Sequence, residues 1–214
     1  YGKGMGDYWP SVPPPPRNPG NRLAHGLGGA LGGISLVVLL VAAMWVIEIV
    51  DTLLLGQLDQ LGIIAQEPYG LPGILFAPFL HAGFGHLMAN SVPLLILGSL
   101  AAIRGVGKFV TASFLITMVS GIGVWLTSPP NTLTLGASGL VFGYFGYVVA
   151  RGLFDRRPLD IVLSVIVVLL YSSLLLGVLP VQPGVSWQGH LFGLIGGVLA
   201  AWLLRRRRYR PLYY

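Results

Sequence analysis

Six long apolar stretches, separated by connections rich in polar residues, glycine or proline, constrain this 214-residue chain more than any other feature. Each is close to the roughly 20 residues that a helix needs to cross the hydrocarbon core of a bilayer. None alternates polar and apolar residues as the strands of a membrane barrel do. The chain therefore predicts an all-α, polytopic membrane protein, a bundle of six transmembrane helices near residues 31–55, 86–103, 109–127, 137–153, 159–179 and 187–204.

The composition excludes several other classes of protein. Charged residues make up 9% of the chain and hydrophobic residues 54%, whereas about a quarter of an ordinary soluble domain is charged. The absence of cysteine excludes disulfides and thiol chemistry. Any metal would depend on four histidines, and His81 and His86 do not share a helical face. We expect no metal and no cofactor.

The positions of the basic residues predict the topology. All 13 lysines and arginines lie before the first stretch, after the second and sixth stretches, or from the end of the fourth stretch to the start of the fifth. The positive-inside rule then places both termini in the cytoplasm. Basic residues at the C-terminus are expected to set topology and attract anionic lipid, not nucleic acid. The expected organisation is a flexible cytoplasmic tail (1–28), a six-helix membrane domain (29–205) and a basic cytoplasmic tail (206–214).

Three polar residues on separate apolar stretches share one depth. Ser138, His190 and Asn90 lie 13, 15 and 14 residues, respectively, before the next basic residue along the chain. At about 1.5 Å per residue, all three lie about 20 Å above the cytoplasmic charges. Polar side chains are costly inside a bilayer and usually have a function there. A shared layer therefore indicates a site.

The residue types in this layer suit nucleophilic catalysis. A serine hydroxyl is a weak nucleophile unless a base takes its proton, so we expect Ser138 to be the nucleophile and His190 the base. Ser138 also opens an apolar helix, where free N–H groups favour a developing oxyanion. His86 and Asn90 are four residues apart, hence on one helical face, and both can donate hydrogen bonds to that oxyanion.

Glycines on two of the stretches allow the serine and the histidine to meet. Small residues recur at a spacing that lets helix backbones approach closely: Gly139, Gly143 and Gly146 on one stretch, and Gly189, Gly193 and Gly197 on the other.

The sequence places no acidic residue in the layer beside the histidine. Asp155 and Asp160 lie at the cytoplasmic end. Glu48 and Asp51 are the only carboxylates expected within the membrane, and a structural role is expected for both. We therefore predict a dyad, with the ring of Phe142 packing against His190 to orient it.

Three segments together resemble the rhomboid intramembrane serine proteases. They are His81-Ala-Gly-Phe-Gly-His86-Leu-Met-Ala-Asn90, Gly136-Ala-Ser138-Gly139 and Gly189-His190-Leu-Phe-Gly193. The resemblance covers roughly residues 30–205 and implies that residues 29–205 are a rhomboid-like protease domain. Its substrates would be transmembrane proteins, and its location the bacterial plasma (inner) membrane.

The resemblance also implies a role for each site residue. Ser138 and His190 form the catalytic dyad, and the oxyanion hole consists of His86, Asn90 and the Ser138 amide. His81 is implied to be a structural residue of the first external loop. The supporting residues of the expected site are His81, Phe142, Gly136, Gly139, Gly189 and Gly193.

This chain departs from the family at several positions. Many members have alanine where this chain has Gly189, and relatives can have tyrosine where it has Phe142. Residues 56–80 contain no arginine, whereas some relatives have a Trp-Arg pair in the equivalent loop.

Two other functions fit a membrane chain with buried polar residues. A catalytically silent family member would bind or traffic membrane helices, but such proteins typically lose the serine or the histidine that this chain retains. A transporter would need a polar pathway, and the sequence has neither an inverted repeat nor an acidic pathway.

Overall fold

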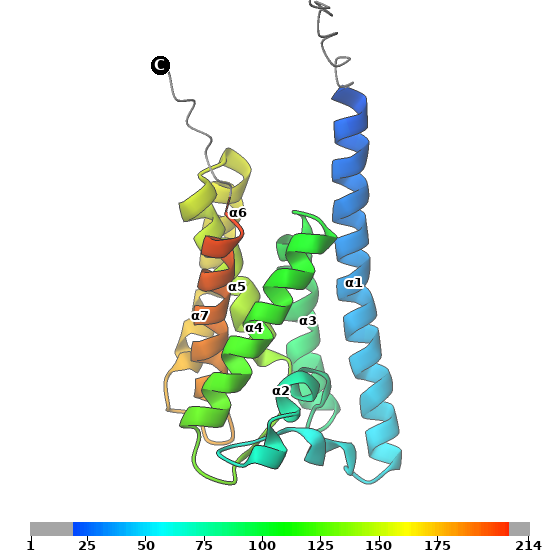
Figure 1. The fold of residues 1–214 in the computed structure, drawn as a ribbon, viewed down its shortest axis with the longest axis vertical. Helices are drawn as coiled ribbons and strands as arrows, with labels where there is room; N and C mark the ends of the chain where they lie inside the picture. Colours follow the sequence, from blue (N-terminus) through cyan, green and yellow to red (C-terminus); the bar gives the residue numbers. More distant parts are fainter. Residues whose placement is uncertain (1–18, 206–214) are drawn as a thin grey trace, which may run out of the picture.

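The computed structural model describes residues 19–205 as a bundle of long helices (Figure 1), which confirms the all-α prediction. Figure 1 places α1 at one edge of the bundle and α6 and α7 at the other. The helices are α1 (Pro19–Leu53), α3 (Phe84–Ala102), α4 (Val106–Thr127), α5 (Ser138–Asp155), α6 (Pro158–Tyr171), which continues as the 3-10 helix η4 (Ser172–Val178), and α7 (Trp187–Leu203).

The first helix begins earlier than the sequence predicted. We expected a flexible tail up to residue 28, but α1 already begins at Pro19, so residues 19–28 are helical and that boundary was wrong. Proline suits the first turn of a helix, because its missing N–H would have no partner there and its φ angle is already helical. The expected tails at 1–18 and 206–214 lie outside the described residues.

Four segments within residues 19–205 are long and apolar enough to cross a membrane: Gly26–Leu53, Phe84–Ala102, Val106–Thr127 and Pro158–Val178. The other two expected membrane helices, α5 and α7, are shorter or more polar. α5 has 18 residues, including Arg151 and Asp155, and α7 has 17. α5 packs against α3, α4, α6 and α7. A helix surrounded by protein does not need an apolar surface toward lipid.

Glycines bring α5 and α7 into direct backbone contact. A Cβ at Gly193 would collide with the carbonyl oxygen of Gly139, and a Cβ at Gly197 would collide with that of Gly143. Only glycine leaves room for such an approach. The small-residue pattern read from the sequence therefore corresponds to this interface.

The connection between α1 and α3 folds against the segment that leads into α5. It contains β1 (Ile63–Ile64), which pairs antiparallel with β2 (Leu133–Thr134). The Trp125 indole N–H donates to the Glu67 carbonyl at 2.9 Å. The strand pairing holds the segment before α5 against the connection, and the Trp125 bond holds the connection against α4. Both satisfy main-chain groups of the connection. The remaining elements of the connection are η1 (Leu58–Leu61), η2 (Pro68–Gly70), α2 (Gly73–Phe76) and η3 (Ala77–Phe79).

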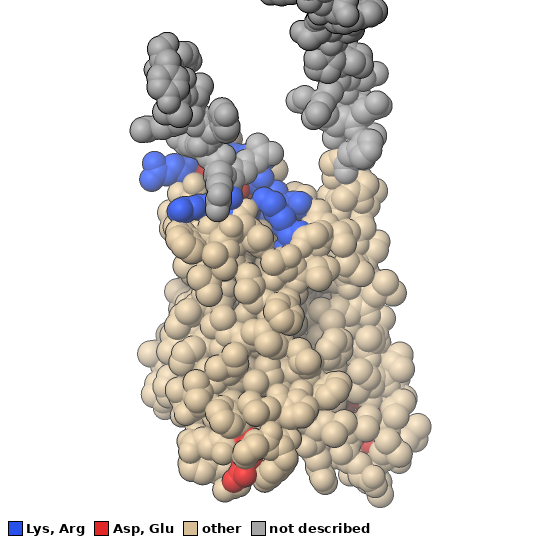
Figure 2. Space-filling model, in the orientation of Figure 1, with Lys and Arg blue, Asp and Glu red and all other residues tan. Residues whose placement is uncertain are grey.

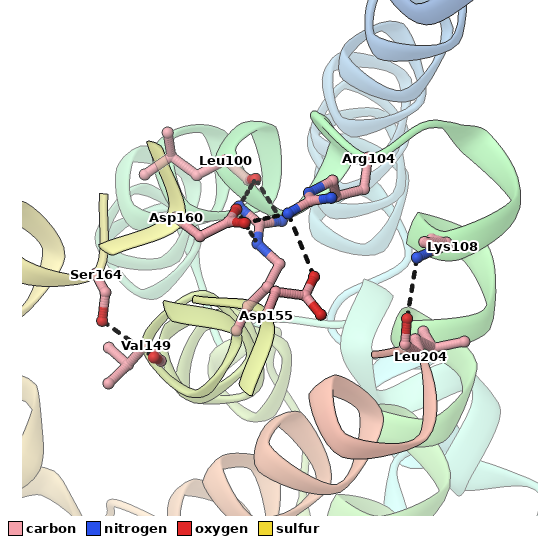
Figure 3. Close-up of polar contacts among 9 residues, drawn as sticks. Leu100, Arg104, Lys108, Val149, Asp155, Asp160, Ser164 and Leu204 are labelled. Atoms are coloured by element: carbon pink, nitrogen blue, oxygen red, sulfur yellow. Dashed lines mark hydrogen bonds and ion pairs between the residues drawn. The ribbon is translucent and has the colours of Figure 1, made fainter. Parts of the chain in front are cut away.

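Lysines and arginines gather at the end of the bundle where α1 begins and α7 ends (Figure 2). Arg104 forms ion pairs with Asp160 and with Asp155, the latter at 3.3 Å (Figure 3). Arg151 pairs with Asp160 at 3.0 Å, and its guanidinium also donates to the Leu100 carbonyl. This cluster joins the end of α3, the end of α5 and the start of α6. Each of its charges is partnered, as buried charges require.

The contact between α5 and α7 predicts different costs for two alanine substitutions. Gly193→Ala should lower the thermal unfolding temperature in detergent by several degrees, because overpacking costs about 1–3 kcal/mol. Gly189→Ala is the matched control: its Cβ would lie 3.3 Å from the Ser186 Oγ and 3.4 Å from Val124, so we expect little change. Equal unfolding temperatures for the two variants would contradict this account of the interface.

Candidate active site

The four polar residues expected in the site line one cleft of about 910 Å³. Ser138 begins α5, His190 lies in the first turn of α7, and His86 and Asn90 lie in α3. Phe142 lines the same cleft. Three helices distant in sequence thus bring these side chains to one space.

A tight backbone turn presents Ser138 to the cleft. Gly136 has a φ angle of +118°, which favours glycine, and its N–H donates to the Ala77 carbonyl at 2.8 Å. The next amide, that of Ala137, donates to the His81 Nε2 at 3.4 Å. His81 therefore supports the turn, and the Ser138 amide lies in the first turn of α5, where N–H groups have no acceptor within the helix.

His86 and Asn90 place N–H donors beside this turn. The Ala82 N–H donates to the His86 Nδ1 at 3.4 Å, so the neutral ring carries its proton on Nε2. A Cβ built on Gly136 would lie 2.8 Å from that Nε2 and 3.8 Å from the Asn90 Nδ2. One Asn90 amide hydrogen is donated to the His86 carbonyl at 3.1 Å. The other remains for a ligand.

The His190 ring is held on one face and at one nitrogen. It stacks on Phe142 with the ring centroids 4.0 Å apart and the planes 7° from parallel, the packing that the sequence predicted. Its Nδ1 lies 2.9 Å from the Gly177 carbonyl oxygen. A carbonyl oxygen can only accept, so Nδ1 donates and the neutral ring keeps a free lone pair on Nε2.

Gly177 was missed by the sequence reasoning. Its segment was read as the outer end of an apolar helix, whereas α6 ends at Tyr171 and continues as η4. A main-chain acceptor carries no side-chain signature. The one available signal was Pro180, which shows that the helix cannot continue normally there.

Two serines, also missed, fix the start of α7. The Ser186 Oγ caps the helix by accepting from the Gly189 N–H at 3.2 Å. The Ser120 hydroxyl, on α4, donates to the Gly189 carbonyl at 2.9 Å. Both bonds are made at the residue before His190. The backbone that carries the His190 ring is therefore fixed by the segment before α7 and by α4.

The carboxylates have structural partners or line the cleft. The Asp51 carboxylate accepts from the Leu58 N–H at 2.6 Å, consistent with its expected structural role. Asp59, in the connection between α1 and α3, lines the same cleft. Burial, and secondarily the nearby charge of Asp51, raise the pKa of Asp59. Among residues 19–205, no group of three or more His, Asp or Glu side chains is arranged to hold a metal ion.

Comparison with known proteins identifies the family. The rhomboid domain model matches residues 70–207. An uncharacterized protein of Mycobacterium tuberculosis is 41% identical over 197 residues, which cover 88% of this chain and 82% of that protein. A Bacillus subtilis protein named "Putative rhomboid protease YdcA" is 31% identical over 133 residues, covering 61% of this chain and 66% of that protein. Rhomboid-like protein 11, chloroplastic, of Arabidopsis thaliana is 32% identical over 145 residues, covering 61% and 51%.

The chain therefore belongs to the rhomboid family. Its apolar helices make it an integral membrane protein. Proteins of this family act on membrane proteins within the bilayer.

Acidification should destabilise the protein through His81, whose Nε2 must stay unprotonated to accept from the Ala137 amide. Burial, the largest cause, and the nearby His86 lower the pKa of His81 to about 4, from an ordinary value of about 6.5. Between these values the unfolded chain binds more protons. The contribution of His81 to stability is therefore complete above about pH 6.5 and is lost as the pH falls toward 4.

The variant His81→Gln keeps an acceptor but does not titrate. We expect its free energy of unfolding in detergent to fall by about 2 kcal/mol less than that of the wild type between pH 6.5 and pH 4. The other histidines titrate in both proteins, so the difference isolates His81. Parallel pH profiles would show that His81 has no such role.

Proposed function

We propose that this protein is an intramembrane serine endopeptidase that hydrolyses peptide bonds in or near the transmembrane helices of membrane proteins. The observation that carries the proposal is the cleft that Ser138 and His190 share with two N–H donors from α3. A serine at a helix start, a histidine with a free Nε2 and an oxyanion site are the parts that acyl transfer needs.

The proposed protease domain spans residues 29–205 and crosses the membrane six times, with both termini in the cytoplasm. Four segments are long and apolar enough to span; α5, which packs against four other helices, and α7 are the other two. The gathering of basic side chains at the end where α1 begins and α7 ends supports this orientation (Figure 2). We assign the protein to the plasma membrane of a bacterium, because its relative of 41% identity is a mycobacterial protein.

In the first half of the reaction, the Ser138 Oγ attacks the carbonyl carbon of the scissile peptide bond. The Nε2 of His190 takes the hydroxyl proton. The substrate carbonyl oxygen becomes negatively charged and accepts hydrogen bonds from the His86 Nε2–H, the Asn90 amide and the Ser138 N–H. The carbon–nitrogen bond then breaks, and the imidazolium gives its proton to the departing amine.

In the second half, water hydrolyses the acyl-enzyme. Neutral His190 takes a proton from the water as its oxygen attacks the ester carbon, and the ring returns that proton to the Ser138 Oγ as the ester bond breaks. The products are a carboxylic acid and the free enzyme. The open cleft gives water a route to the site.

A substrate helix would reach the cleft from the lipid between α3 and η4. Both elements line the cleft, α3 through Ala89 and Pro93 and η4 through Leu174. α3 and α6 each pack against α5, which lies behind the site. Local unwinding of the substrate would then expose a peptide bond to Ser138.

Removing either member of the dyad should abolish cleavage. We expect Ser138→Ala and His190→Ala to release no product from a transmembrane reporter in liposomes, with loss of at least about 10³-fold in rate. Both variants should unfold at temperatures close to that of the wild type. Unimpaired cleavage by Ser138→Ala would refute the assignment, and a wild type that neither cleaves nor reacts with a fluorophosphonate would favour a silent helix-binding protein.

Loss of one oxyanion donor should slow the reaction without abolishing it. We expect Asn90→Ala to lower kcat by about 10²-fold, while KM changes little, because the bond forms mainly in the transition state. Asn90→Asp, similar in size but without the N–H donors, should be at least as slow. An unchanged kcat for both variants would remove Asn90 from the oxyanion hole.

A further inference from the structure

The strongest unassigned feature of the site is the main-chain carbonyl of Gly177, which lies 2.9 Å from the Nδ1 of His190. We propose that Gly177 is the positioning residue for the base and supplies with its backbone what an acidic side chain supplies in a catalytic triad. The inference rests on the proposed function, because it assigns the means by which that active site orients its histidine.

The hydrogen bond selects one form of the ring. The Gly177 oxygen accepts, so the proton of neutral His190 lies on Nδ1 and the lone pair lies on Nε2. A ring with the opposite tautomer could not take a proton from a serine through Nε2. The same bond fixes rotation about the ring axis, while the Phe142 stack fixes the ring plane. Together they define the orientation of the base.

The carbonyl of Gly177 is available because a proline lies three residues later in the chain. In a 3-10 helix, a carbonyl accepts from the N–H three residues later. For Gly177 that residue is Pro180, which has no N–H to donate. The next amide, that of Val181, donates to the Leu179 carbonyl instead. Proline therefore leaves an acceptor at the end of η4 that the histidine occupies.

The position also requires a glycine. A Cβ at Gly177 would lie 2.8 Å from the Phe142 Cζ and 3.0 Å from the His190 Nδ1. Both separations are too short for a methyl group, so any side chain would move the ring or the stack. Gly177 thus provides a carbonyl that no main-chain N–H occupies and leaves space for the rings of Phe142 and His190.

The test measures both the ring state and the catalytic rate. Nitrogen-15 NMR of histidine-labelled protein in detergent, with the His190 signals assigned through His190→Gln, should show the wild-type proton on Nδ1. Gly177→Ala should reduce that tautomer and lower kcat on the transmembrane reporter at least about tenfold, with KM within about twofold. Gly107→Ala is the matched control, because its Cβ would meet nothing within 4 Å, and both readouts should match the wild type.

Several outcomes would overturn the inference. A wild-type His190 with its proton on Nε2 would do so without any variant, which covers the case of a Gly177→Ala protein that fails to fold. An unchanged tautomer and kcat in a folded Gly177→Ala protein would do so too. If the wild type cleaves nothing but its tautomer depends on Gly177, the proposed function fails while the orienting bond stands.

Discussion

The backbone contact between α5 and α7 sets the geometry on which the rest of the cleft depends. Gly193 lies against the Gly139 carbonyl without a Cβ to separate them. Gly139 is the residue after Ser138, and Gly193 is less than one helical turn from His190. Any increase in the distance between α5 and α7 would also move the Ser138 hydroxyl away from the His190 ring. The Ser120 bond to the start of α7 adds a third element, α4, to the same contact. Helix packing thus contributes directly to the positions of Ser138 and His190.

Three histidines in or beside the cleft are hydrogen-bonded to main-chain groups. His81 accepts from the Ala137 amide, His86 accepts from the Ala82 amide, and His190 faces the Gly177 carbonyl. Each bond sets which ring nitrogen carries the proton, without a full charge in the apolar layer. The paired arginines and aspartates lie instead at the end of the bundle where α7 ends (Figure 3). This separation suits a bilayer, where an ion is costly and a neutral hydrogen bond is not.

Residue counts along the chain grouped Ser138, His190 and Asn90 because helical rise is constant, and the three residues line one cleft. Glycine spacing predicted the α5 contact with α7 for an equally local reason. The cleft-lining position of Asp59 depends on how a long connection folds back, which no local pattern records. The contact of Gly177 escaped because a carbonyl is present at every residue. The length of α1 was underestimated because residues 19–28, which include several glycines, were assigned to a flexible tail.

An orienting group made of backbone has a consequence for how the site tolerates mutation. A carboxylate acceptor can be lost through any substitution of one acidic residue, whereas the carbonyl at position 177 survives every substitution. The sensitive properties are the small size of Gly177 and the lack of an N–H at Pro180. Selection would therefore act there on shape, not on charge. The proposed dyad would in this way keep an oriented base without placing an anion in hydrocarbon.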